Sequence, residues 1–326
     1  AEIVYYTPQL MKGLFYPYVQ YFNYRYLKDD ALIVGIESYT RQALKKYRGF
    51  FNLLSTPIAT VLKKTQRDYV FVQHGVVQAG INLSVGALKG FPASGVGYDL
   101  IERAALCVLF NASGLSKNDP TLCDFSNKNI CITGYLKAPY RVNPKAVCFN
   151  KMGAHFKERV LVCHAFGIDS RFSLAMQAVF YSQLKGIAAE YPDRQFIIRP
   201  HRGRFYQMDS KIITDNLIVA WADQGAFKGV ETPALLKHVH RVISPPSSIL
   251  IDACYFDIPI AVYANHFDVF ELLPQVDSYK AFNEFMISPI RTLQEHSRAL
   301  KSCYGEDLSS NIERAASAIQ DYARAS

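Results

Sequence analysis

Short apolar runs recur along this chain, and segments with helical spacing lie between them. Each run has the composition of a buried β-strand. The alternation of strand and helix is what a parallel sheet with crossover helices requires, so the pattern predicts an α/β protein. The strands are expected at residues 31–35, 69–73, 106–110 and 129–133 in the first half, and at 159–163, 195–199, 217–220, 241–243 and 258–263 in the second.

Helices are predicted between these runs and along the C-terminal tail. They are expected at residues 39–54, 99–105, 173–191 (where Pro192 ends the segment) and 290–325. The tail carries an intermittent apolar stripe, which predicts that it packs on the rest of the chain rather than forming a further domain. The stripe consists of Leu293, Leu300, Ile312, Ala315, Ile319 and Tyr322.

The length of the chain predicts two domains, because 326 residues are too many for one typical hydrophobic core. Residues 136–156, which contain Pro139, Pro144 and polar interruptions, are predicted to be the linker. We therefore expect two Rossmann-like, doubly wound parallel-sheet domains that face each other across a cleft, at residues 1–150 and 151–290. Helices at 291–326 would pack on both.

Composition and charge narrow the classes of protein. Half of the residues are hydrophobic and 20% are charged, which excludes a disordered chain. No apolar run is long enough to span a membrane, and the start at Ala1 has no secretory signal pattern, so a soluble protein is expected. The net charge of +8 favours a polyanionic partner, whether nucleic acid, anionic lipid or a phosphorylated substrate. Seven cysteines without metal-ligand spacing indicate free thiols in a reducing cytoplasm.

The segment Ser-Pro-Pro-Ser-Ser after the strand at 241–243 has the outline of an anion site. Its prolines stop the strand, and Ser247 and Ser248 fall where a following helix would be capped. The first N–H groups of a helix have no partner inside it and the helix dipole makes that end positive, so hydroxyls and free N–H groups suit a phosphate. The alternative is that the two serines only cap the helix.

Two histidine motifs also follow strands. His74 and Gly75 come directly after the strand at 69–73, at the edge where open α/β sheets place their ligands. An imidazole there is able to take a proton from an alcohol. The strand at 195–199 ends in a set of cationic and imidazole side chains that suits phosphate oxygens, although a solvated basic loop would look the same. That set is Arg199, His201, Arg202 and Arg204.

Two further candidates complete the predicted site. Gly134, in Thr133-Gly134-Tyr135 after the strand at 129–133, would allow close packing in the cleft, unless it is a plain turn. Arg171 follows the strand that ends at Cys163 and His164. Neither half carries the glycine-rich turn of dinucleotide binders or a phosphate-binding loop that ends in Gly-Lys-Ser/Thr, which disfavours hydride transfer and nucleoside triphosphate hydrolysis.

In this order, from residue 69 to 263, the motifs resemble those of the CDP-glycerol glycerophosphotransferases, the teichoic-acid polymerases and primases of GT-B glycosyltransferase fold. The resemblance implies that His74 is the acceptor-side base, that His201 contacts the donor pyrophosphate, and that Ser247, Ser248 and Asp252 form the donor motif. Two positions depart from the family pattern, because Arg202 replaces a proline and Pro245 replaces an aspartate.

The serine pair also resembles GT-B transferases that use CMP-activated acidic sugars, such as Kdo transferases and sialyltransferases. With such a donor an acidic residue would serve as base, and the loop candidates are Asp169, Asp223 and Glu231. A basic nucleic-acid-binding module and an inactive GT-B scaffold are the alternatives of other classes. Since the basic groups lie at strand ends rather than in a stripe, nucleic acid is not expected as a partner.

The favoured hypothesis is a transferase that needs neither metal nor resident cofactor, with a cytidine nucleotide as donor substrate. Ser247, Ser248 and the helix start would bind the donor phosphates, and Arg199, His201 and Arg202 would neutralise the leaving nucleotide. Asp252 would act indirectly, without contacting the phosphates, because a carboxylate that faces a phosphate would repel it. The resemblance implies a glycan or lipid-linked acceptor and a cytoplasmic protein, placed at the inner face of the plasma membrane by its basic surplus.

Overall fold

The first half of the chain contains a four-stranded parallel sheet. The computed structural model describes residues 33–35 (backbone only), 68–73, 104–111, 129–137, 155–164, 174–200, 213–222, 224–265 and 268–325. The strands follow one another in the order β1-β2-β3-β4, and each pairs in parallel with the next. They are β1 (Ile33–Gly35), β2 (Tyr69–Val72), β3 (Leu106–Leu109) and β4 (Asn129–Ile132).

The second half contains a five-stranded parallel sheet in the order β7-β6-β5-β8-β9. Its strands are β5 (Glu158–His164), β6 (Arg194–Pro200), β7 (Leu217–Val219), β8 (Arg241–Ser244) and β9 (Ile260–Val262). All nine predicted strands are therefore present, with ends that differ by one or two residues. The apolar runs inside β2, β3, β5, β6 and β8 are explained by burial on both faces, as in other parallel sheets, whereas β4 is partly exposed.

Helices cover both faces of the second sheet. They are α5 (Leu174–Glu190), α6 (Thr232–Leu236), α7 (Ser248–Cys254) and α8 (Tyr279–Ile287), with short 3-10 turns η7 (Gly225–Phe227) and η8 (Asp268–Phe270). Alternate residues of β5 enter different cores, because successive side chains of a strand point to opposite faces. Val160 and Val162 pack with α5 and α8, whereas Leu161 packs with α6 and α7.

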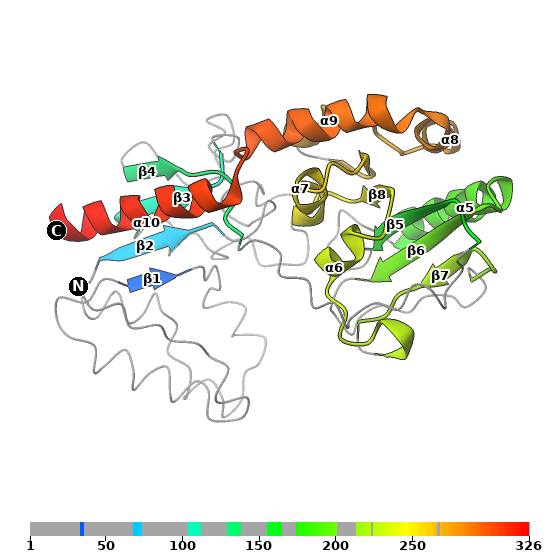
Figure 1. Cartoon of the computed structure of the whole chain (residues 1–326), viewed down its shortest axis with the longest axis horizontal. Coiled ribbons are helices and arrows are strands. Elements are labelled where there is room, and N and C mark those ends of the chain that lie inside the picture. Colours follow the sequence, from blue (N-terminus) through cyan, green and yellow to red (C-terminus); the bar gives the residue numbers. More distant parts are fainter. Residues whose placement is uncertain are drawn as a thin grey trace.

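The C-terminal tail is helical, as predicted, and it connects the two halves. Helix α9 (Ile290–Cys303) packs against α7 and β9, and α10 (Leu308–Ala325) then lies across the first sheet (Figure 1). Ala315 of α10 is buried with Val70, Leu106 and Val108. The predicted stripe is correct except at Ile312, which is 37% exposed.

Several predictions from the sequence concern residues that the structure does not describe, or describes only in part. The helix at 39–54 lies outside the described residues, and so do residues 138–154 of the linker predicted at 136–156. Of the helix at 99–105 only Ala104 and Ala105 are described, and neither is helical. The described cysteines are free thiols. Within the part of the chain that the structure describes, no helix is long and apolar enough to cross a membrane.

Candidate functional site

The strand order of the second sheet places a ligand-binding position between β5 and β8. From β5 the chain adds β6 and β7 on one side of the sheet, and it then adds β8 and β9 on the other side of β5. The direction in which strands are added therefore reverses between β5 and β8. In open α/β sheets, ligands bind outside the carboxyl ends of the strands at such a switch point. His164 ends β5 and the serine motif follows β8, so both lie at this position.

The serine motif forms the helix start that the sequence predicts. Helix α7 begins at Ser248, and Ser247 is its N-cap, with an extended backbone and a side chain that accepts a hydrogen bond from Ile249 N at 3.5 Å. The two prolines before it end β8, because proline cannot donate to a strand ladder. Ser247 and Ser248 are both partly exposed, while Pro245 and Pro246 are buried.

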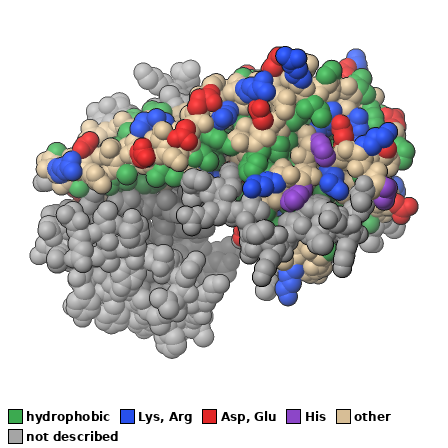
Figure 2. Space-filling view, viewed as in Figure 1, with side chains coloured by type: hydrophobic (Ala, Val, Ile, Leu, Met, Phe, Trp, Pro, Cys, Tyr) green, Lys and Arg blue, Asp and Glu red, His purple; other side chains and the backbone are tan. Residues whose placement is uncertain are grey.

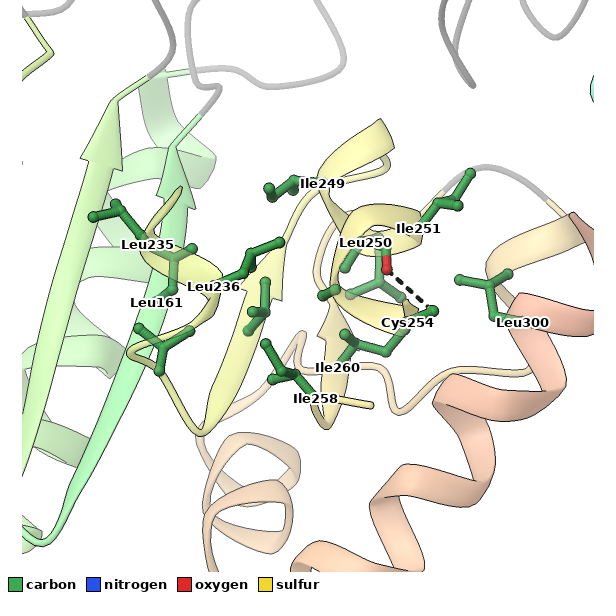
Figure 3. Packing of buried hydrophobic residues seen from close by; sticks show 14 of the residues in the cluster. Leu161, Leu235, Leu236, Ile249, Leu250, Ile251, Cys254, Ile258, Ile260 and Leu300 are labelled. Atoms are coloured by element: carbon green, nitrogen blue, oxygen red, sulfur yellow. Dashed lines mark hydrogen bonds between the residues drawn. The ribbon is translucent and has the colours of Figure 1, made fainter. Parts of the chain in front are cut away.

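Helix α7 is held in place by apolar packing. Its Ile249, Leu250 and Cys254 lie among side chains of β5, α6, β9 and α9, which Figure 3 shows at close range. The Cys254 thiol donates to Leu250 O at 3.1 Å, one turn earlier in the helix. Because this short helix is fixed on several sides, the serine pair at its start has a defined position relative to the sheet.

Asp252 of α7 is bonded to the segment that follows β4. Its carboxylate is buried and accepts a hydrogen bond from the Tyr135 hydroxyl at 2.8 Å, and it forms an ion pair with Lys137. Burial, and then the Asp252 carboxylate, raise the pKa of Tyr135, which therefore stays a neutral donor. The carboxyl ends of β4 and β8 thus meet through these side chains.

Gly134 adopts a left-handed backbone with φ of 91° and packs tightly against α10. A β-carbon at this position would come within 2.5 Å of the Asn311 side chain. The close approach expected of this glycine is therefore made by Asn311. Whether Gly134 also contacts a donor stays a prediction.

Arg199 is buried at the end of β6 and its guanidinium holds the segment that leads to α6. It donates to Ala220 O at 2.7 Å, to Thr232 Oγ1 at 3.3 Å and to Val230 O. These contacts position the loop beside the sheet edge. A contact between Arg199 and phosphate stays a prediction.

His164 is a residue at this position that the sequence did not single out. It is buried, its Nδ1 is hydrogen-bonded to the Tyr181 hydroxyl, and the two rings are stacked with centroids 5.6 Å apart. Burial lowers the pKa of His164 to about 4, so the imidazole is neutral at pH 7. A histidine directly after the predicted strand at 159–163 was the available signal.

The buried imidazole predicts a loss of stability in acid. Its pKa is about 4 in the folded protein, against 6.5 for an ordinary solvent-exposed histidine, so on acidification the unfolded chain takes up the proton first. Stability from this residue is complete above pH 6.5 and decreases as the pH falls towards 4, by as much as about 3 kcal/mol. Urea unfolding at several pH values checks this. The variant His164→Gln should lose that part of the pH dependence, and an identical pH slope in both proteins contradicts the prediction.

The remaining predicted site residues are not placed. His74, Arg171, His201 and Arg202 lie outside the described residues, as do Arg204, Asp169 and Asp223. Glu231, the remaining acidic candidate, is exposed just before α6. In the ranges given above, no group of three or more His, Cys, Asp or Glu side chains is arranged to hold a metal ion.

Comparison with solved structures shows the GT-B fold. Staphylococcus aureus MnaA in its UDP co-structure is similar over 89% of this chain and 75% of that chain, with a TM-score of 0.55 and 14% identity. A Listeria monocytogenes protein described as a putative UDP-N-acetylglucosamine 2-epimerase is similar over 90% and 74%, with a TM-score of 0.54 and 12% identity. The Wall Teichoic Acid Polymerase TagF, soaked with CDPG, is similar over 82% and 71%, with a TM-score of 0.50 and 13% identity.

No family model matches the chain, and no curated protein sequence matches it. The two parallel sheets and the structural likenesses together show the predicted GT-B class of α/β fold.

Proposed function

We propose that this protein is a transferase that moves a glycosyl or phosphoalditol group from a cytidine-nucleotide donor to a hydroxyl of a cell-surface glycan or lipid-linked acceptor. One observation carries the proposal: a serine-capped helix begins at the switch point of the second sheet, in a fold shared with proteins whose structures contain UDP or CDPG. Helix starts and hydroxyls at such a position suit nucleotide phosphates.

The second half of the chain would hold the donor. In the proposal the domain at 151–290 binds the nucleotide through Ser247 and Ser248, and His201, Arg202 and Arg171 supply the positive charge that a leaving nucleotide requires. Arg199 supports this set by holding the loop before α6. Asp252 serves it indirectly, since its carboxylate is bonded to Tyr135 and Lys137. These cationic groups take the part that a divalent metal plays in other transferases.

The first half would present the acceptor. In the proposal the domain at 1–150 places His74 at the carboxyl edge of its sheet, where it takes the proton of the acceptor hydroxyl. The helices at 291–326 hold the two domains together. The protein would act in the cytoplasm, at the inner face of the plasma membrane. A CMP-activated acidic sugar is the second candidate donor, with Glu231, Asp169 or Asp223 as base.

The charge distribution on one face bears on the nucleic-acid alternative. A protein that follows a nucleic-acid backbone needs a dense stripe of Lys and Arg. Figure 2 shows that Lys and Arg side chains along α9 and α10 are mixed with Asp and Glu side chains on the described part of that face. In α9, for example, Arg291 and Arg298 flank Glu295. This face therefore favours the transferase over a nucleic-acid-binding module.

Nucleotide binding is the first test. We expect CDP or CMP to raise the melting temperature more than UDP, GDP or a short oligonucleotide does, because the proposed donor is a cytidine nucleotide. A ligand at about 100 times its Kd adds about 2.7 kcal/mol to stability. The double variant Ser247→Ala with Ser248→Ala should weaken that binding at least about tenfold, since hydrogen bonds to charged groups are lost. Thermal shift and titration calorimetry measure both effects.

Ser278 offers a matched control, because it caps α8 and accepts from Ala281 N at 3.2 Å. Ser278→Ala should cost a similar helix cap, about 1 kcal/mol, and leave nucleotide affinity unchanged. Stabilisation by the oligonucleotide alone, lost at high salt, would overturn the transferase proposal in favour of nucleic-acid binding.

A further inference from the structure

The loop after β4 and the turn between α9 and α10 are bonded to each other. Tyr135 N donates to Tyr304 O at 2.8 Å, and Asn311 Nδ2 donates to both Tyr135 O at 3.1 Å and Tyr304 O at 2.9 Å. Arg314 of α10 adds two hydrogen bonds to Thr133 O, at 3.0 and 3.2 Å. The chain leaves the first sheet in this loop and returns to it through this turn, so the connections between the two sheets meet at Tyr135.

The same loop reaches α7 with two donors. The Tyr135 hydroxyl and the Lys137 ammonium both bind Asp252, whose side chain is 3% exposed, whereas that of Lys137 is 31% exposed. Tyr135 also packs edge-on against Phe110 and lies parallel to Tyr255. The Tyr135 side chain thus contacts Phe110, the residue after β3 of the first sheet, at one side and Asp252 of α7 at the other.

The polar chemistry of this contact has a geometric consequence. Apolar side chains of similar volume would pack there without the cost of removing charges from water. A buried carboxylate instead requires its donors at defined distances and angles, so it tolerates little sliding of the loop against the helix. Asp252 lies four residues after Ser248, about 6 Å along the helix axis. The bonded position is therefore one turn from the proposed donor site.

From these contacts we infer that Tyr135, Lys137 and Asp252 form a joint that sets the position of the first sheet's carboxyl edge relative to the start of α7. Tyr135 and Lys137 are positioning residues for the proposed transfer, which this inference takes as its premise. In the proposed function, nucleotide binding uses only groups of the second half. Transfer also requires the carboxyl edges of the two sheets at a defined distance and orientation. Loss of the joint should therefore reduce kcat more than donor affinity.

Hydrogen exchange tests the joint without any ligand. The Tyr135 amide belongs to a residue of the joint and donates to Tyr304 O in the turn between α9 and α10, so its exchange reports local opening of the loop that carries Tyr135 and Lys137. We expect Lys137→Met and Asp252→Asn each to make this amide exchange about tenfold faster, and the double variant to add little, because both remove one interaction. The amide of Ile198 in β6 is the internal reference and should not change. Lys137→Met keeps the test valid if Asp252→Asn does not fold.

The exposed ion pair between Arg298 and Asp257, at 3.1 Å, is the matched control. Arg298→Met and Asp257→Asn should leave the Tyr135 amide unchanged. In transfer assays, Lys137→Met should lower kcat about tenfold with less than about a threefold change in CDP affinity, and Lys137→Arg should restore most of the rate. If the Tyr135 amide exchanged at the wild-type rate in Lys137→Met, the inference of a joint would be overturned. If the wild-type protein bound none of CMP, CDP, UDP and GDP, the proposed function would fail. The exchange experiment would still test the joint, because it needs no nucleotide.

Discussion

Replacing His74 by alanine is expected to lower the rate of group transfer by about 10²- to 10⁴-fold, the usual contribution of a general base. The prediction for His74 rests on the strand that precedes it. Tyr69–Val72 forms β2, and the next residue, Gln73, is buried, with its backbone N–H bonded to Val108 O and its side chain bonded to Phe110 N. The chain is thus held beside β3 up to the residue before His74, at the edge where ligands of α/β sheets bind.

Nucleotide binding separates this role from a structural one. The His74→Ala variant should bind CDP or CMP with wild-type affinity, because the proposed donor-binding groups Ser247, Ser248 and His201 belong to the second half of the chain. Steady-state transfer assays and calorimetry on the same preparation measure both quantities. His155→Ala, at an exposed histidine, is the control and should retain full activity. A fully active His74 variant would show that another group takes the proton.

Replacing Asn311 by leucine is expected to lower the free energy of unfolding by about 3 to 5 kcal/mol, although the two side chains have similar size. Asn311 has no exposed surface. Its amide bonds the carbonyls of Tyr135 and Tyr304, and its oxygen accepts from Arg314. Leucine would remove the donor to the two buried carbonyls and the acceptor for the Arg314 guanidinium. Each buried polar group that is left without a partner costs about 1 to 3 kcal/mol.

Denaturant unfolding followed by circular dichroism measures this effect. Ile312→Ala, at the next and exposed position of α10, should change stability by less than about 1 kcal/mol. Asn311 also occupies the space that Gly134 and Gly305 leave open, since a β-carbon at either glycine would approach its side chain within 2.5 Å. An Asn311→Leu protein as stable as the Ile312→Ala protein would mean that the polar contacts contribute little.

The strands and the start of α7 were predictable because their signals are local. A strand such as Val160 to Cys163 is apolar throughout, and burial on both faces selects for that composition wherever the strand lies in the sheet. The prolines and serines before α7 act on their own backbone, by ending a strand and capping a helix. Local chemistry of this kind is similar in most tertiary surroundings.

The partners of Asp252 and Asn311 had no such signal. Asp252 meets Tyr135, 117 residues earlier in the chain, and Asn311 meets Tyr135 O across 176 residues. A side chain shows its hydrogen-bonding capacity in the sequence, but not which distant group will come within about 3 Å of it. The sheet order that makes β5 and β8 a switch point, and so brings His164 next to the serine motif, likewise depends on pairings between distant strands.

By itself the sequence determined the α/β class and the nine strands, because composition and backbone chemistry act over a few residues. The residues that would bind phosphate or move a proton stay a prediction of the sequence. Only the tertiary structure decided that Tyr135 and Lys137, in the loop after β4, bind Asp252 of the second half, and that Asn311 of α10 hydrogen-bonds the same loop. These contacts form only when the whole chain has packed, since burial and distance, not residue type, select the partners.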